Sequence, residues 1–366
     1  MRYILNKHEE MLFALLRASL HERVPEESYF VGATDKDWKR CYRLAARQGV
    51  KALAWDGIVK LPSELMPPKE VKLSWATGVM SYEQVYSRYC QTLNELARQY
   101  AEHGIVTMQI KGVGLSALYP IPLHREGGDI DIYTYSADTT KMSHEEANNF
   151  ADQLMREQGI EVDVEYYKHS NFYYKGIPIE NHKCFLNVHE SPFFAHADEV
   201  LHKYMAPTLT TLPVGEILTP SAKFNTLFLA FHAARHYGSG LSLHHLCDWV
   251  VLINKCGLHM PVEIKDKRFL RFVDVLTMLC NKYLGTNVPV AVADEMLANE
   301  LLDEMLNPKY PDDVTNKSRL AVFVYKLQRF YHNHRLANKV FTTSLTRRLL
   351  TSIIYHIRKP ETILQW

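Results

Sequence analysis

The stretch KGVGLSALYPIPLHREGGDIDIY, residues 111–133, combines a glycine turn, an arginine and two aspartates within a short length of chain. It begins near Gly112 and Gly114 and ends with Asp129 and Asp131, which are separated by one isoleucine. Successive side chains of a β-strand point to opposite faces, so both aspartates lie on one face of the expected strand. Two carboxylates this close repel each other unless a positive charge lies between them. The stretch therefore predicts a source of positive charge beside the aspartates.

A divalent cation is the simplest source of that charge. Carboxylate oxygens suit Mg²⁺ or Mn²⁺, and Mg²⁺ in proteins typically binds a few carboxylates together with substrate phosphates. The alternative is an exposed strand end with two solvated aspartates. The turn at Gly112 favours the cation, because a glycine turn that follows a strand and opens a short helix presents backbone N–H groups to a phosphate. Phosphate and metal ligands are thus expected at one place.

Length and composition are those of an ordinary globular protein. The chain has 366 residues, a formal net charge of +1 and 47% hydrophobic residues, which exclude a polyelectrolyte and predict either two or three domains or one elaborated domain. The six cysteines are scattered without a CxxC pair, so we expect reduced thiols rather than disulfides or structural zinc. No cleavable leader or apolar run of ~20 residues is recognisable, which predicts a cytoplasmic protein with no membrane partner.

The hydrophobic pattern divides the chain into three parts. Residues 1–88 carry apolar positions at three- and four-residue steps and are expected to be helical. Residues 89–195 contain strand patterns and one amphipathic helix near 143–159, and residues 196–366 return to a helical pattern. We therefore predict an α+β protein, in which a mixed β-sheet core is flanked by N-terminal and C-terminal helical regions.

Three segments of the central part have the pattern of strands. IVTMQIKG, residues 105–112, precedes the glycine turn, and GGDIDIYT, residues 127–134, carries the aspartates. Residues 162–191 are rich in β-branched and aromatic residues and contain the turn YKGI, which predicts a hairpin. In IPIENH, the side chains of Glu180 and His182 face away from the isoleucines. Glu180 is therefore a third candidate acid, and His182 either supports the site or is a histidine satisfied at a strand end.

This order of elements resembles the DNA polymerase β-like nucleotidyltransferase superfamily, and within it a bacterial family of uncharacterised nucleotidyltransferases. The residues that carry the resemblance to that family are Lys111-Gly112, Tyr119-Pro120, Arg125 and GDIDI at 128–132. FHAARHYGSGLSLHHLCDW, residues 231–249, is similar to the helical segment that follows in the family. The core of the resemblance covers about residues 90–195. It implies a nucleotidyltransferase-like sheet and a transferase that uses a nucleoside triphosphate.

The resemblance also implies roles for individual residues. In the superfamily, a pair of aspartates and a third carboxylate on a neighbouring strand bind two metal ions, and the glycine turn holds the triphosphate. By position, Asp129, Asp131 and Glu180 become the catalytic residues and the ligands of two Mg²⁺ or Mn²⁺ ions. The implied phosphate-binding residues are Lys111, Gly112, Val113 and Arg125. For Lys111 and Arg125, the alternative role is an ion pair with the acids.

The implied reaction transfers a nucleoside monophosphate from an NTP to a hydroxyl of a small molecule, an RNA or a protein. The metal ions neutralise charge on the phosphates, and Glu180 is a candidate acceptor for the proton of the hydroxyl. The superfamily commonly has a serine after the turn glycine, where this chain has Val113. The alternative function is therefore a catalytically inactive nucleotide-binding or regulatory protein that retains the fold. A metal-dependent phosphohydrolase fits the glycine turn less well.

Two further features lie in the C-terminal part. His232 and His236 are four residues apart on an expected helix, a spacing that chelates zinc, and Asp248 lies downstream. They are candidates for side chains that support the active site, or they are histidines on a helix face. Residues 316–359 contain ten Lys or Arg and no Asp or Glu. This segment predicts either a nucleic-acid surface or a solvated face that balances the acidic stretch at 293–306.

Overall fold

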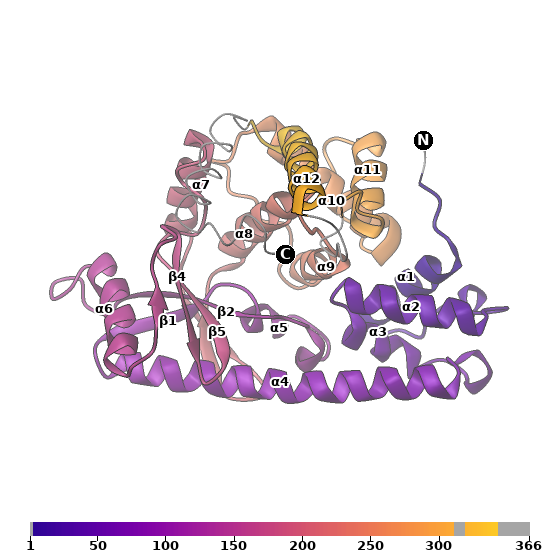
Figure 1. Ribbon diagram of the computed structural model, residues 1–366, viewed down its shortest axis with the longest axis horizontal. Coiled ribbons are helices and arrows are strands. Elements are labelled where there is room, and N and C mark those ends of the chain that lie inside the picture. The colour runs from indigo at the N-terminus through magenta and orange to yellow at the C-terminus, as the bar shows by residue number, and fades with distance from the viewer. Residues whose placement is uncertain (1–2, 311–318, 343–366) are drawn as a thin grey trace.

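The computed structural model describes residues 3–310 and 319–342 (Figure 1), and within them the chain forms twelve α-helices and seven strands. The strands form one mixed sheet in the order β3-β4-β5-β2-β1-β7-β6. They are β1 (Ile105–Gln109), β2 (Ile130–Ser136), β3 (Val162–Asp163), β4 (His169–Tyr174), β5 (Ile177–His182), β6 (Thr208–Thr211) and β7 (Glu216–Thr219). The predicted α+β class, with a sheet between helical regions, is confirmed.

The helices precede, interrupt and follow the sheet. The first four are α1 (Lys7–Leu20), α2 (Asp35–Arg47), α3 (Lys51–Ile58) and α4 (Lys69–Ala101). Those between the strands are α5 (Val113–Ser116), α6 (His144–Glu157) and α7 (Pro192–Lys203). The remainder are α8 (Ala222–His236), α9 (Leu243–Cys256), α10 (Lys267–Leu279), α11 (Glu295–Leu306) and α12 (Arg319–Val340). None of these helices is both long enough and apolar enough to cross a bilayer.

Helix α4 joins the two halves of the molecule. Figure 1 shows it along the lower edge, passing beneath both the N-terminal helices and the strands. Near its start, Trp75 packs into a core shared by the N-terminal and C-terminal helices, whereas Tyr86 and Leu93 pack under the sheet. The boundary expected between residues 88 and 89 thus falls inside one continuous helix. The division into 1–88, 89–195 and 196–366 stays a prediction.

The two faces of the sheet differ in chemistry. Ile130 and Ile132 of β2 and Ile179 of β5 are buried against α4 and α6 in a single apolar cluster. The alternation predicted for these strands is confirmed, because Asp131 and Glu180 lie on the opposite face. The apolar face fixes the register of the strands, since a shift by one residue would turn the isoleucines away from this core.

Short sequence motifs also predicted a helix start and a turn correctly. Ser143 and Glu146 form the reciprocal hydrogen bonds of a capping box at the start of α6. Lys175 and Gly176 have φ angles of 52° and 76° and form the tight turn between β4 and β5. All six cysteines lie in the described part of the chain and are free, as expected.

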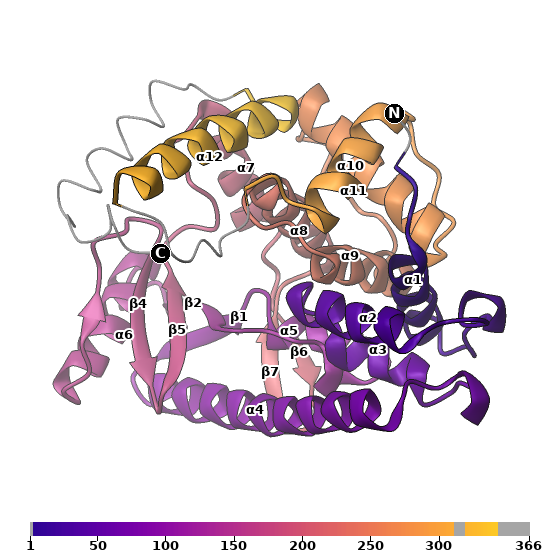
Figure 2. The ribbon, with the colours of Figure 1, turned by 45° about the vertical axis from the view of Figure 1, so that its right-hand side comes forward.

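Two strands lie where the sequence pattern predicts only helices. β6 and β7 pair antiparallel, and β7 joins the sheet beside β1 through Met108 and Leu218. Figure 2 shows this hairpin next to α5 and above α4, and Asn94 Nδ2 of α4 donates to the carbonyl of Val214 at 2.9 Å. The expectation of helices alone beyond residue 196 is wrong for this hairpin. Strands of four residues, with β6 mostly exposed, are too short to show an alternating pattern.

Part of the basic C-terminal segment is described. Of residues 316–359, those at 316–318 and 343–359 lie outside the described residues. In α12, Arg335 and Lys339 both pair with Glu300 of the acidic stretch, and His332 Nε2 lies 3.0 Å from Glu304 Oε2. These contacts match the alternative in which the basic segment balances residues 293–306. Binding of nucleic acid by this segment stays a prediction.

Candidate active site

The turn after β1 has a backbone conformation that requires glycine at position 112 and leaves little room for a side chain at position 114. Gly112 has φ 63° and ψ −125°, a region that side chains with a Cβ strongly disfavour. Gln109 Nε2 donates to the carbonyl of Lys111 at 2.7 Å and would lie 3.2 Å from a Cβ at position 112. A Cβ on Gly114 would lie 3.1 Å from Thr219 Cγ2 of β7. The turn is therefore closely packed, and it places Lys111 at the end of β1 beside β2.

The acids predicted from the sequence come together around Lys111 and His182. Asp131 and Glu180 are direct partners across the parallel strands β2 and β5. Asp131 is fully buried, and its Oδ1 lies 3.0 Å from Lys111 Nζ and 3.1 Å from His182 Nε2. His182 Nε2 also lies 3.4 Å from Glu180 Oε2. Asp129 is more exposed, and its Oδ2 lies 3.7 Å from Lys111 Nζ. Lys111 thus forms the ion pair with the acids that the sequence left as an alternative.

Electrostatics keep two of these carboxylates ionised. Burial alone would raise the pKa of Asp131, but the Lys111 charge and the hydrogen bond from His182 outweigh it and lower the pKa. Burial likewise opposes ionisation of Glu180, yet the hydrogen bond from His182 lowers its pKa. Burial and the neighbouring charge of Asp131 raise the pKa of Asp129. The three acids therefore differ in their readiness to hold a proton.

The residues fit a divalent cation on the side of Glu180. Oδ2 of Asp131 is buried and has no hydrogen-bond partner among the described residues, although buried polar atoms are normally satisfied. One ligand atom each from Asp131, Glu180 and His182 lie within 4.8 Å of one another. The carboxylate oxygens of Asp131 and Glu180 suit Mg²⁺ or Mn²⁺, with His182 beside them as a hydrogen-bond donor. A second ion between Asp129 and Asp131 requires that Lys111 first leave them.

Arg125 lies away from the acids. Its Nε and Nη2 atoms donate to Asp248 Oδ1 and Oδ2 of α9 at 3.1 and 2.8 Å, and Nη2 lies 2.9 Å from His244 Nε2. The Tyr119 hydroxyl donates to Asp248 Oδ1 at 2.7 Å. Burial would raise the pKa of Asp248, but the Arg125 charge outweighs it and lowers the pKa. Arg125 therefore pairs with Asp248 rather than with the predicted acids, and its contact with phosphate stays a prediction.

Asp129 lies between two clefts. The first has a volume of about 510 Å³, and its lining includes Lys111, Gly112, Asp129, His232, His236 and His245. The second has a volume of about 1030 Å³, and its lining includes Asp129, Glu161, Asp163, Tyr173 and Glu180. The glycine turn thus opens into the first cleft, whereas Glu180 lines the second.

Sequence reasoning missed two residues beside the acids. His169 of β4 is paired with His182 in the hairpin register, and its Nε2 lies 3.6 Å from Glu180 Oε2. The two-residue turn fixes that register, so this neighbour could have been found from the sequence. Burial lowers the pKa of Lys168, and the nearby Lys111 charge lowers it further. Lys168 lies before β4 in an irregular segment, and no sequence signal places it near Lys111.

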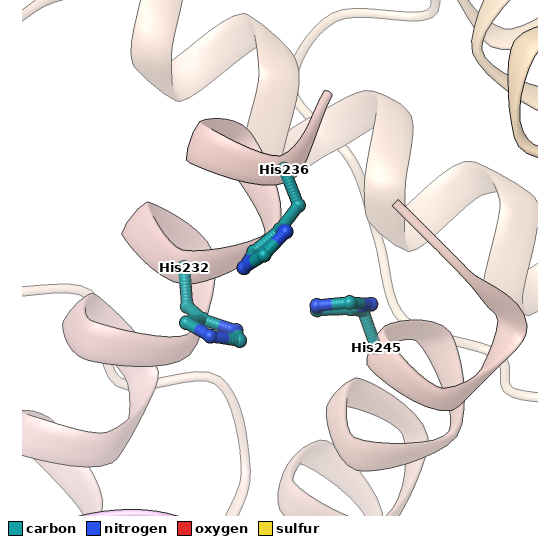
Figure 3. Close-up of side chains that lie close together, drawn as sticks. All are labelled: His232, His236 and His245. Atoms are coloured by element: carbon teal, nitrogen blue, oxygen red, sulfur yellow. The ribbon is translucent and has the colours of Figure 1, made fainter. Parts of the chain in front are cut away.

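The two predicted histidines of α8 are joined by a third from α9. The ring centroids of His232 and His236 are 4.6 Å apart, and the ring centroid of His245 lies 5.0 Å from that of His232 and 4.8 Å from that of His236. Figure 3 shows the three rings directed toward one another. Asp248, the downstream residue considered with this pair, is held by Arg125 instead. Sequence reasoning missed His245, because its place beside the pair depends on how α9 packs against α8.

Comparison with known proteins identifies the family. The model of the family described as "Uncharacterised nucleotidyltransferase" matches residues 34–285, more than half of the chain. The matched range contains the glycine turn, all three acids and the α8–α9 histidines. Neither a curated protein nor a solved structure gave a significant match. The chain belongs to this family of uncharacterised nucleotidyltransferases.

Proposed function

We propose that the protein is a metal-dependent nucleotidyltransferase that moves a nucleoside monophosphate from an NTP to a hydroxyl acceptor. The observation that carries the proposal is the direct pairing of Asp131 with Glu180 across β2 and β5, next to the glycine turn. Asp131 is fully buried, and one of its oxygens has no hydrogen-bond partner in the described part of the chain, an arrangement that costs stability unless a cation uses it. With no bilayer-crossing helix and six free cysteines among the described residues, we also propose a cytoplasmic location.

The metal ligands in this proposal are Asp131 and Glu180, with His182 beside them and Asp129 available for a second ion. When bound, Mg²⁺ or Mn²⁺ neutralises charge on the phosphates and lowers the pKa of the acceptor hydroxyl. Lys111 contributes a positive charge at the mouth of the glycine turn, where it would exchange the acids for triphosphate oxygens. Lys168 would add a second positive charge nearby.

The transfer itself is a substitution at the α-phosphorus. The acceptor oxygen forms a bond to that phosphorus, the bond to the bridging oxygen of the β-phosphate breaks, and pyrophosphate leaves. Glu180 would accept the acceptor's proton, because its carboxylate is ionised and lines the second cleft. Two histidines lie beside this carboxylate, with Nε2 of His182 3.4 Å and Nε2 of His169 3.6 Å from Glu180 Oε2.

The clefts suggest separate places for the two substrates. The triphosphate fits the first cleft, which contains the glycine turn and Lys111. Among the described residues, the second cleft is lined by four carboxylates, those of Asp129, Glu161, Asp163 and Glu180, and by no Lys or Arg. A polyanionic acceptor would be repelled there. We therefore favour a neutral or positively charged acceptor, a small molecule or a protein, over an RNA strand.

Calorimetry with each of the four ribonucleoside triphosphates, with and without Mg²⁺, tests the proposal. We expect binding that requires Mg²⁺ and that disappears in the Asp129→Asn, Asp131→Asn double variant. Asp138→Asn is the matched control, because Asp138 lies just beyond β2 and is 45% exposed. Circular dichroism establishes that each variant is folded. Absence of binding by every triphosphate would exclude the proposal.

The alternative is a nucleotide-binding protein without transfer. It is favoured by Val113 in the turn and by the Lys111 ammonium between Asp129 and Asp131. Pyrophosphate release separates the two functions, because a binding protein retains Mg²⁺-dependent affinity for NTP without releasing pyrophosphate.

Pools of small amines, amino sugars and peptides are the acceptors to assay first, given the acidic second cleft.

A further inference from the structure

Three histidines converge where α8 and α9 meet the first cleft. His232 and His236 are one helical turn apart, which places both on one face of α8. His245 lies in the first turn of α9, and Figure 3 shows its ring between the other two and the body of that helix. One nitrogen from each ring can be chosen so that all three lie within 4.8 Å of one another. The cluster is distinct from the acids, whose group is formed by Asp131, Glu180 and His182.

Local structure fixes the third ring. The chain reverses between α8 and α9 through Gly238 and Gly240, which have φ angles of 85° and 125°. At the start of α9, the backbone N–H of Ser242 donates to Nδ1 of His245 at 3.2 Å, and Ser242 Oγ lies 3.0 Å from the same nitrogen. Nε2 is therefore the ring nitrogen of His245 left for the cluster. A metal on Nε2 requires the tautomer with the proton on Nδ1, so binding would exchange the bond from the Ser242 backbone N–H for one from Nδ1–H to Ser242 Oγ.

The surroundings keep these imidazoles neutral. Among residues 3–310 and 319–342, no carboxylate forms an ion pair with His232, His236 or His245. Burial lowers the pKa of all three, and for His236 it and the Lys111 charge lower the pKa to about 4. Neutral imidazole is the form that binds transition metals. The three rings line the first cleft and face one another, which brings their nitrogen lone pairs together.

We propose that His232, His236 and His245 bind a divalent transition metal of the Zn²⁺ type. Three imidazoles with an open fourth position are a ligand set of zinc sites that also bind water or substrate. Bonds of ~2.0–2.1 Å in tetrahedral geometry place ligand nitrogens about 3.3 Å apart, so modest movements of the rings complete the site. Imidazole ligands favour Zn²⁺, Cu²⁺ or Ni²⁺ over Mg²⁺, which separates this site chemically from the acids.

The open position faces the cleft that contains Lys111, Gly112 and Asp129. A metal ion there would contact a water molecule or an anionic oxygen of whatever occupies that cleft. A triphosphate in the first cleft would thus have a second source of positive charge opposite the glycine turn. The metal site itself does not depend on nucleotidyl transfer, because its ligands are independent of the three acids.

Titration of metal-free protein with Co²⁺, which serves as a spectroscopic probe, tests the site. We expect one equivalent to bind with visible absorption bands of tetrahedral nitrogen coordination, and Zn²⁺ to displace it. A chromophoric chelator then gives the Zn²⁺ affinity of the wild type and of His232→Ala, His236→Ala and His245→Ala. Each variant should bind at least about 100-fold more weakly, since loss of a group that only orients a ligand already costs about 10- to 100-fold.

Two controls make the outcome decisive. His196→Ala removes a half-exposed histidine of α7 outside the cluster, and Asp131→Asn disables the acid site. Both should retain the wild-type Zn²⁺ affinity. Glutamine replacements at 232, 236 and 245, which preserve side-chain size, replace any alanine variant that circular dichroism shows to be unfolded. Unchanged affinity in the folded cluster variants, or loss of the ion in Asp131→Asn alone, would overturn the proposal, as would absence of Co²⁺ binding by the wild type.

Discussion

Replacement of Arg125 by methionine should strongly destabilise the protein. The side chains of Arg125 and Asp248 are each 5% exposed, so the substitution leaves a carboxylate buried without its cation. Breaking a buried pair in this way costs about 3–5 kcal/mol in the free energy of unfolding. The Tyr119 hydroxyl at 2.7 Å and His244 Nε2 at 3.3 Å remain beside Asp248 and offset part of the loss. We therefore expect a decrease near the lower end of this range, about 3 kcal/mol.

Urea unfolding of single and double variants measures this loss. Arg125→Met combined with Asp248→Leu should recover most of the stability, because it removes the uncompensated charge together with its partner. The coupling free energy follows from the double-mutant cycle, provided that the slope of unfolding free energy against urea stays constant. Lys141→Met is the matched control, since its pair with Asp138 is exposed and should leave the unfolding midpoint unchanged.

Two results would refute this reasoning about Arg125. A loss below about 1 kcal/mol, typical of an exposed pair, would mean that Arg125 and Asp248 do not form the buried pair described above. A variant with wild-type stability that no longer binds NTP would instead identify Arg125 as a phosphate ligand, the role implied by the family resemblance. The two roles are distinguishable because one is measured by unfolding and the other by calorimetry.

Two further predictions concern the turn and a buried histidine. Gly112→Ala should lower the free energy of unfolding by about 1–3 kcal/mol, because Gly112 has a positive φ. Gly128→Ala is the control and should leave this free energy unchanged, since a Cβ there would meet nothing within 4 Å. Urea unfolding measures the free energy of both variants. Burial would lower the pKa of His124, but the hydrogen bonds and charges of Asp56 and Glu83 outweigh it and raise the pKa. Stability from protonated His124 is then complete below its unfolded pKa of ~6.5 and is lost as pH rises through the raised folded pKa. The difference in unfolding free energy between wild type and His124→Asn should therefore shrink from pH 6 to pH 8, and a constant or growing difference would contradict this assignment.

Local patterns explain which parts of the fold were predictable. The alternation in β2 and β5, the capping box of α6 and the turn at Lys175-Gly176 each depend on residues a few positions apart. The hairpin of β6 and β7 was not predictable, because four-residue strands carry too little alternation. The continuity of α4 was also missed, since its two halves bury apolar residues in different cores.

In the candidate site, too, local features were predictable from the sequence and long-range contacts were not. Alternation placed Asp131 and Glu180 each opposite the isoleucines of its own strand. That the two strands are neighbours was implied only by the family resemblance, and the register that pairs the two acids comes from the structure. The partner of Arg125 lies 123 residues away in sequence, and no local pattern connects it to Asp248. His245 was hidden for a related reason, because its place beside His232 depends on how α9 returns along α8. Long-range packing, rather than motif, decides both assignments.

Lys111 offsets the charge of the two neighbouring aspartates. Its ammonium lies within 3.7 Å of Asp129 and 3.0 Å of Asp131, so one positive charge offsets both carboxylates of the pair. Metal binding between these aspartates would displace that charge, and a buried ammonium without a partner is costly. In the proposed function, a triphosphate in the adjacent turn would supply the new partner. Under the proposed function, we therefore expect metal and triphosphate to bind together more tightly than either alone.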